Sequence, residues 1–441
     1  MPELQVSQNG FLEEASAQRS LRDFCTCEAK LHGDEFVGIR YDGKIQINFP
    51  LGYFKDDHEI QEMEEEALRD EVRNLFEILS DSNLSDVHED SSYTLHDGAS
   101  SSVSFPMRSY LSLLRDFIEF GYLSEQDVSY RQGGNGRISW SRTIKKTHPT
   151  VLGDGKNIFY LNPIARHVNR NETEIISLIH KFCVQDASRK IGFLFGIDIE
   201  EQSVLDFDYE VFSSVLLARI SHTFNDRHLR LFQDMLRIVE YLGERSVFDN
   251  SLPDTFHFGV HKFEHIWESL VNNVFGNEPR EKYNPHCGWK IAGASPAEIE
   301  MRPDTVMSFG GELFIIDSKF YSYGGGGNSL PQTESITKQF AYAEYAEHIS
   351  GKVVHNVFIL PYCAGAESGT TGNVRPFRMQ YIGYAYSDWK NIDKSAPAKG
   401  PVKTYHKIHA FYLDVKSLMK DYTNSKFAQK ALADYTKEKE A

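Results

Sequence analysis

The alternation of apolar and polar positions is clearest in the C-terminal half of the chain. Residues 313–316 form a short apolar run that follows two glycines, which predicts a buried strand. Residues 305–309 predict a strand before it, and the short turn between them predicts a β-hairpin. Because side chains alternate along a strand, we expect Asp317 and Lys319 on one face. Asp304 opens the first strand, so it should meet them at one end of the hairpin.

Periodic apolar patterns also predict helices and strands in the rest of the chain. Helical periodicity is found upstream of the hairpin and again downstream, followed by further short apolar runs. The expected helices are 258–275 and one opening at 338–345, and the expected strands are 353–361, 380–386 and 407–413. This order predicts an α/β (α+β) fold in which helices flank a mixed sheet. Near the N-terminus, residues 36–40 and 44–49 predict a second hairpin around an Asp-Gly turn, followed by a helix over 58–79.

Composition divides the chain into three expected domains. Residues 1–105 hold the acidic hairpin and helix, and end in a Ser- and Asp-rich stretch typical of a linker. Residues 106–250 hold a basic hairpin and helices, a candidate surface for DNA or a partner protein. Residues 251–441 hold the central hairpin and its helices.

The net charge of −16 argues against nucleic-acid binding until the charges are located. Residues 1–100 hold 8 Lys and Arg against 23 Asp and Glu, whereas residues 101–441 hold 39 against 40. The acidity therefore belongs to the N-terminal region, either as a solvated surface or as a docking surface for a partner. A local basic surface on the rest stays compatible with DNA binding.

The features that the sequence lacks predict the cellular compartment of the protein. It has no run of eighteen apolar residues, and its first residues lack the basic and apolar regions of a secretory signal. Its five cysteines are scattered, without zinc-site spacing. These features predict a cytoplasmic protein with free thiols and no membrane contact.

The chemistry expected at the hairpin end is that of two carboxylates and an ammonium. Asp304 and Asp317 can hold Mg²⁺ through hard oxygen ligands, and the metal lowers the pKa of a bound water. Lys319 beside the metal can orient that water or assist its deprotonation. The ordinary alternative is a surface ion pair at a strand end.

Two flanking helices offer further candidates. Glu264 and Glu268 lie four apart on the upstream helix, so either can add a carboxylate to the site. Gln339 and Tyr342 share one face of the downstream helix, after a Gly-rich loop at 324–330. Solvated side chains on amphipathic helices are the alternative for each residue.

A basic segment at 130–150 is a candidate DNA surface. It contains cations and a central tryptophan with no acidic residue, and such residues contact phosphates and stack on bases. A basic hairpin packed against the acidic N-terminal region is the alternative. The candidate residues are Arg131, Arg137, Trp140, Arg142, Lys145 and Lys146.

These motifs resemble a known nuclease family. Pro303-Asp304 followed by Asp317-Ser318-Lys319 resembles the PD-(D/E)XK nuclease core, and the Gln339 helix resembles one that follows it in RecB- and McrC-type nucleases. The order of motifs, with the Gly-Arg-Ile-Ser-Trp string from residue 136, resembles the LlaJI family of restriction endonucleases, which is related to McrC.

The resemblance implies a restriction-endonuclease-like fold over 251–441. It also implies that Asp304 and Asp317 bind metal, that Lys319 assists the water, and that Glu264 or Glu268 completes the site. An McrB-like AAA+ GTPase, encoded separately, is implied as a partner.

The main hypothesis is a Mg²⁺-dependent type II site-specific deoxyribonuclease that cuts double-stranded DNA. The alternative is a non-catalytic DNA-recognition or activator subunit of an McrB-like GTPase. A repair nuclease acting on ends or flaps differs from the first only in substrate. A homodimer is one option for the assembly.

Overall fold

The computed structural model describes most of the chain. The described residues are 21–30, 36–41, 44–81, 84, 105–123, 125–133, 137–151, 158–171, 175–197, 199, 205–248, 256–292, 297–321, 330–364, 376–387 and 403–440. The expected linker after residue 81 and the Gly-rich loop at 324–330 lie almost wholly outside them.

The chain divides into two compact units. Unit 1 joins residues 1–100 with 252–441, and unit 2 consists of residues 101–251. The first and third of the three expected segments therefore fold together, while the middle segment forms a unit of its own.

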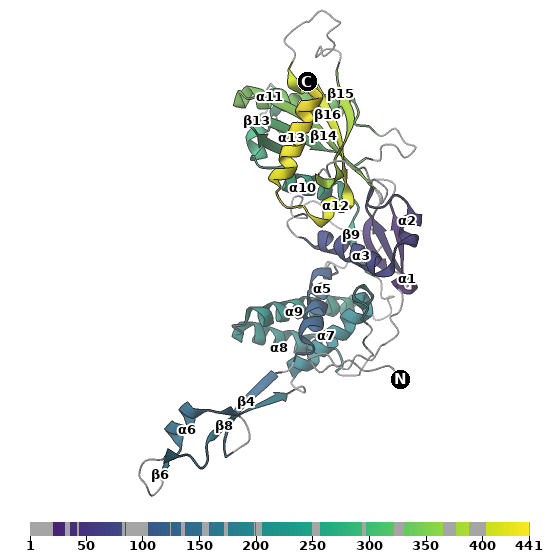
Figure 1. The fold of residues 1–441 in the computed structure, drawn as a ribbon. Helices are drawn as coiled ribbons and strands as arrows, with labels where there is room; N and C mark the ends of the chain where they lie inside the picture. Colours follow the sequence, from purple (N-terminus) through teal and green to yellow (C-terminus); the bar gives the residue numbers. More distant parts are fainter. Residues whose placement is uncertain are drawn as a thin grey trace, which may run out of the picture. The chain divides into compact units, whose positions relative to one another are not determined.

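The centre of unit 1 is a five-stranded mixed sheet (Figure 1). Its strand order is β12-β13-β14-β16-β15. Its strands are β12 (Thr305–Phe309), β13 (Glu312–Ser318), β14 (Val354–Tyr362), β15 (Gln380–Ala385) and β16 (Ile408–Asp414). The expected hairpin is confirmed, because β12 and β13 pair antiparallel from Thr305 opposite Ile316 to Phe309 opposite Glu312. The expected mixed sheet is confirmed as well, since β13, β14 and β16 run parallel and the edge strands antiparallel.

Helices cover both faces of this sheet. On one face, α11 (Thr333–Ser350) packs Tyr342 and Ala343 against Leu313, Ile315 and Val354. The side chains in between point the other way, where His355 of β14 bonds Glu440 of α13 (Lys426–Glu440). The helix α10 (Phe263–Phe275) contacts both β12 and α13.

Glu440 fixes the end of α13 to the sheet. The His355 Nδ1 to Glu440 Oε1 distance is 2.7 Å, and His355 Nε2 lies 3.1 Å from Glu312 Oε2 on β13. Burial acts to raise the pKa of Glu440, but the hydrogen bonds with His355 and His409 outweigh it and bring that pKa to about 2. The C-terminal helix is thus held to the sheet by a hydrogen bond between a buried histidine and a carboxylate.

The expected helix over 258–275 is wrong in its first residues. Phe256–Val260 form strand β9 instead, and the helix begins at Phe263. β9 pairs antiparallel with β2 (Val37–Tyr41), which pairs with β3 (Ile45–Phe49) as the second expected hairpin. Pairing with a distant strand overrides the local helical period here.

A four-stranded sheet therefore joins the two chain segments that make up unit 1, residues 1–100 and 252–441. Its order is β1-β3-β2-β9, with β1 at Cys25–Ala29. The helices beside it are α1 (Leu21–Phe24), α2 (Asp57–Glu62) and α3 (Glu65–Ser80). The helix expected over 58–79 is thus present as two, which meet at residues 63–64.

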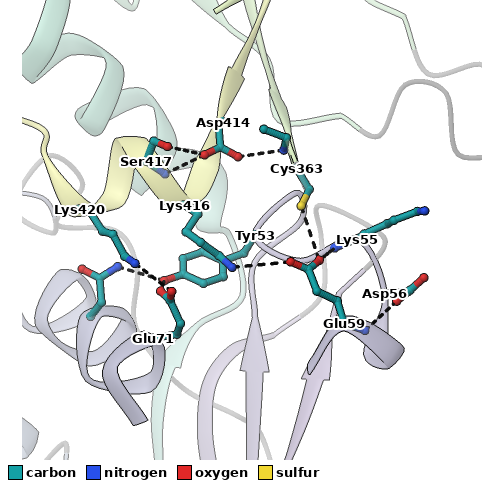
Figure 2. A network of polar contacts seen from close by, with 12 residues as sticks. Tyr53, Lys55, Asp56, Glu59, Glu71, Cys363, Asp414, Lys416, Ser417 and Lys420 are labelled. Atoms are coloured by element: carbon teal, nitrogen blue, oxygen red, sulfur yellow. Dashed lines mark hydrogen bonds and ion pairs between the residues drawn. The ribbon is translucent and has the colours of Figure 1, made fainter. Parts of the chain in front are cut away.

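Polar contacts also tie α2 and α3 to α12 (Val415–Lys420), as Figure 2 shows. Lys420 Nζ donates to Glu71 Oε1 at 2.8 Å, and the Tyr53 hydroxyl donates to Glu71 Oε2 at 2.6 Å. Lys416 Nζ lies 3.8 Å from Glu59 Oε1. Part of the N-terminal acidity is therefore matched by lysines of the C-terminal region.

In its described residues, unit 2 combines four helices of fourteen or more residues with one short helix and a small sheet. The longer helices are α5 (Met107–Phe120), α7 (Ile175–Ile191), α8 (Tyr209–His222) and α9 (Asp226–Phe248). The sheet has the order β4-β8-β5, with β4 at Glu125–Gln132, β8 at Ile164–Asn171 and β5 at Arg137–Ile138. A two-stranded sheet pairs β6 (Thr150–Val151) with β7 (Ile158–Phe159).

The expected basic hairpin is wrong in its pairing. β4 and β5 both pair with β8 rather than with each other. The basic residues that follow β5 form the short helix α6 (Trp140–Lys146). Among the helices that the structure describes, none is long and apolar enough to cross a membrane.

Glycines allow the close pairing of β2 with β9. A Cβ on Gly259 would lie 2.1 Å from the Val37 carbonyl oxygen, and a Cβ on Gly38 would lie 2.2 Å from the Phe258 carbonyl oxygen. Gly38 also has a φ of +138°, which side chains rarely adopt. Only glycine fits at this crossing.

We expect Gly259→Ala to lower the free energy of unfolding by about 2–3 kcal/mol, because backbone of β2 must move to admit the methyl group. Urea denaturation followed by circular dichroism measures the loss. Gly351→Ala is the control, since a Cβ there meets nothing within 4 Å at a φ of +65°. It should cost about 1 kcal/mol for backbone strain alone. Equal losses in the two variants would contradict the close-approach argument.

Candidate active site

The hairpin places two carboxylates at one end of the sheet. Thr305 pairs with Ile316, so Asp304, just before β12, comes beside the end of β13. The backbone N–H of Ser318 donates to Asp304 Oδ2 at 2.7 Å. Asp317 is buried and follows Ile316 on β13. Sequence reasoning expected this convergence, and the register of the two strands produces it.

Lys319 lies on the same side as Asp317. Its Nζ is 2.6 Å from Asp317 Oδ2, and its backbone N–H donates to the Ile359 carbonyl at 2.8 Å. Burial acts to lower the pKa of Lys319, but the charge and hydrogen bond of Asp317 and the charge of Asp304 outweigh it, so that this pKa is raised. Lys319 is therefore an ammonium at neutral pH.

Burial and like charge raise the pKa of the other two acids, Asp304 and Glu268. Burial raises the pKa of Asp304 well above its usual value, and the charges of Asp317 and Glu268 raise it further. Burial likewise raises the pKa of Glu268, with the charge of Glu264 second, to about 7. Three carboxylates thus share a desolvated corner with one ammonium.

The choice between Glu264 and Glu268 follows from this coupling. The charge of Glu268 raises the pKa of Asp304, and the charge of Asp317 raises the pKa of Glu268, whereas Glu264 is a cause of the shift of Glu268 alone. The Glu268 side chain is 32% exposed and that of Glu264 is 48% exposed. His265 lies between them, 4.0 Å from each carboxylate. The geometry favours Glu268 as the helix carboxylate of the site.

The acids suit a divalent cation by their chemistry. Their oxygens are the hard ligands that Mg²⁺ prefers, and burial, followed by neighbouring carboxylates, raises the pKa of Asp304 and of Glu268, an effect that a bound cation would oppose. Within the described part of the chain, no three His, Cys, Asp or Glu side chains are already arranged as a metal cage. Oδ2 of Asp304 and Oδ2 of Asp317 are instead engaged with Ser318 and Lys319.

Gln339 and Tyr342 support the strands from α11. The Gln339 side chain is fully buried, and its Nε2 donates to the Ile315 carbonyl of β13 at 2.8 Å. The Tyr342 hydroxyl donates to the Arg302 carbonyl at 2.7 Å, two residues before Asp304. Gln339, expected among the catalytic residues, is therefore placed as a positioning residue beneath β13.

Arg280 is a residue of this corner that sequence reasoning missed. It lies in a 3-10 turn (Arg280–Tyr283), where its Nη1 donates to the Asp304 carbonyl at 3.3 Å. Its charge also acts to lower the pKa of Glu268. The turn has no periodicity, so no signal in the sequence marked this arginine.

The six candidate DNA contacts lie in unit 2. Each has an exposed side chain on β4, β5 or α6, and Trp140 is 56% exposed. The Arg142 guanidinium lies 3.8 Å above the ring of Tyr130. The structure gathers these residues in one small subdomain and leaves their DNA contact a prediction.

Beyond the separate motifs, the model of one protein family matches most of this chain. The family model described as LlaJI restriction endonuclease matches residues 36–380. This chain belongs to the LlaJI restriction endonuclease family. The matched range covers β2, β3 and β9 of the N-terminal sheet, unit 2 and the acid and lysine corner, so the resemblance extends over most of the chain.

One curated relative carries a functional name. The chain is 27% identical over 260 residues to the "Type II restriction enzyme BsuMI component YdjA" of Bacillus subtilis (strain 168). The match covers 55% of each protein, so the chain spans about half the length of this relative.

A solved structure is also similar. It is a half-complex from a tetradecameric assembly of Thermococcus gammatolerans McrB AAA+ hexamers with bound McrC. The match has a TM-score of 0.36 and 15% sequence identity, and covers 91% of this chain and 83% of that chain.

We expect Glu268→Gln to stabilise the metal-free LlaJI-family protein. The folded-state pKa of Glu268 is about 7 against 4.5 for an ordinary glutamate, so wild-type stability falls as the pH rises between these values. The glutamine carries no charge to desolvate. The gain should be absent below about pH 4.5 and reach about 1–2 kcal/mol above pH 7, allowing for solvent screening.

Thermal denaturation in EDTA across this pH range measures the gain. Glu281→Gln is the control, because the Glu281 side chain is 73% exposed and should leave stability unchanged. A Glu268→Gln protein less stable than wild type at high pH would refute the assigned charge crowding.

Proposed function

We propose that this protein is a Mg²⁺-dependent endonuclease that hydrolyses phosphodiester bonds of double-stranded DNA within a restriction system. The observation that carries the proposal is the meeting of Asp304, Asp317, Glu268 and Lys319 in one desolvated corner. Membership of the LlaJI family and the likeness to a restriction enzyme component support it.

Asp304, Asp317 and Glu268 would hold the metal. Bound Mg²⁺ neutralises charge on the scissile phosphate and makes a bound water more acidic. The three acids would fix the position of the metal ion. Gln339 and Tyr342 hold β13 and the segment before β12, which carry two of these acids. Without a cation, burial and then the charge of neighbouring carboxylates raise the pKa of Asp304 and of Glu268.

Lys319 acts through its positive charge. Because the charges of Asp317 and Asp304 raise its pKa, Lys319 carries an ammonium in the metal-free protein, which suits it to donate hydrogen bonds rather than to accept a proton. It donates hydrogen bonds to Asp317 at rest and to the attacking water or a phosphate oxygen during the reaction. A fixed ammonium in a buried site stabilises developing negative charge strongly.

We expect Lys319→Ala and Asp317→Asn each to reduce plasmid cleavage by at least about a hundredfold, since each removes an interaction at the reacting phosphate. Gel analysis of circular DNA with Mg²⁺ measures it, and linear DNA tests whether free ends are the substrate. Lys430→Ala, an exposed lysine of α13, is the control. Full cleavage by Asp317→Asn would overturn the proposed site.

Unit 2 offers a second contact with DNA. The cations around Trp140 form an exposed basic surface, which supports phosphate contact. Apolar side chains lie beside them, such as Ile144 at 61% and Leu161 at 76% exposure, and these are equally suited to a protein partner. That partner would be an McrB-like GTPase, for which this chain would be an activating subunit.

A triple substitution of Arg142, Lys145 and Lys146 to Ala separates these two roles. If the surface binds DNA, binding to a duplex should weaken at least tenfold and depend less steeply on salt, by about 0.9 in logarithmic slope for each lost phosphate contact. Replacing Lys426, an exposed lysine at the start of α13, controls for charge. If the triple variant binds DNA as wild type does but no longer responds to the McrB-like GTPase, the basic surface contacts that partner instead of DNA.

A further inference from the structure

A two-stranded ribbon directly precedes Asp304 in the sequence. Among the described strands, it forms a sheet of its own and pairs with no other strand. β10 (His286–Trp289) pairs antiparallel with β11 (Ala297–Glu300), and among the described strands neither pairs with a third. All four residues of β10 are exposed. β10 therefore presents its side chains to solvent instead of contributing to a core.

The base of the ribbon is nevertheless held firmly. The Met301 N–H donates to the Pro285 carbonyl at 2.9 Å, and Asn284 Nδ2 donates to Glu300 Oε1 at 2.8 Å. The bond from Tyr342 to the Arg302 carbonyl then fixes the chain that runs directly from β11 into Asp304. The active site and the ribbon are thus joined by a short, anchored segment.

The exposed side chains of the ribbon suit nucleic acid. Trp289 is 69% exposed, and Lys290 beside it is exposed with no ion-pair partner among the described residues. Arg302 is also exposed, although it pairs with Glu300 at 2.9 Å. An indole stacks on bases or sugars, and ammonium groups contact phosphates.

We propose that the β10–β11 ribbon binds the duplex beside the scissile phosphate, with Trp289 and Lys290 as its main contacts. This inference rests on the proposed function and names a DNA-binding element of the same site. Four residues of strand extend about 13 Å, and the major groove, about 12 Å wide, admits a two-stranded ribbon. Glu298 and Glu300 of β11 offset the charges of Lys290 and Arg302, so it is the direct continuity of the ribbon with Asp304 that favours DNA over a protein partner.

The test compares DNA binding of the full chain with that of a Trp289→Ala, Lys290→Ala double variant. Fluorescence anisotropy with a mixed-sequence duplex of about 30 base pairs, with Ca²⁺ replacing Mg²⁺, measures the dissociation constant at several salt concentrations. We expect about a tenfold weaker affinity and a salt slope shallower by about 0.9, as for one lost phosphate contact. Trp289→Phe should retain most of the affinity, because phenylalanine can also stack.

The matched control is Lys426→Ala with Phe427→Ala. This pair also combines a lysine with an aromatic side chain, and Phe427 is 67% exposed on α13. It should bind DNA as wild type does. Wild-type affinity and salt slope in the Trp289, Lys290 variant would overturn the ribbon's role, as would a loss of self-association in sedimentation with DNA binding intact.

Failure of the proposed function looks different. A wild-type protein that binds the duplex but never cleaves DNA with Mg²⁺ would refute the nuclease assignment, while the binding comparison would still decide the role of the ribbon.

Discussion

Like charge crowded into a desolvated corner is the constraint on which this structure depends. Asp304, Asp317 and Glu268 would repel one another less in water, where the dielectric constant is high. At the end of the hairpin they are partly removed from water, and one ammonium offsets them. Such an arrangement costs stability and persists because the packed sheet around it over-determines its geometry. That cost is the reason to regard the corner as functional.

The surrounding fold serves to keep that corner rigid. α11 reaches both strands from one side, with Gln339 bonded to β13 and Tyr342 to the segment before β12. On the other face, α13 is held to the sheet through His355 and Glu440. The carboxylates therefore cannot relax apart without breaking buried hydrogen bonds, which are costly to leave unmade.

The N-terminal region is part of the same unit rather than an acidic appendage. β2 pairs with β9, which leads into the helix that carries Glu268. Glu71 and Glu59 meet Lys420 and Lys416 of α12. The strong negative charge of the first hundred residues is thus partly used for packing. Within unit 2, exposed cations gather on β4, β5 and α6, as the near-neutral balance of the remaining chain allowed.

The sequence by itself determined the elements of the site and their order. An apolar run ending in Asp317 and Lys319, after a turn and a strand opened by Asp304, dictates which side chains converge, because strand alternation and hairpin pairing are local rules. Other features depended on contacts between residues far apart. Pairing with β2 turned residues 256–260 into a strand, and pairing of both β4 and β5 with β8 replaced the expected hairpin. Only the tertiary structure brought the charge of Glu268 to act on Asp304, buried Gln339 beneath β13 and placed Arg280 at the corner, since burial and charge interactions arise from packing that no local pattern encodes.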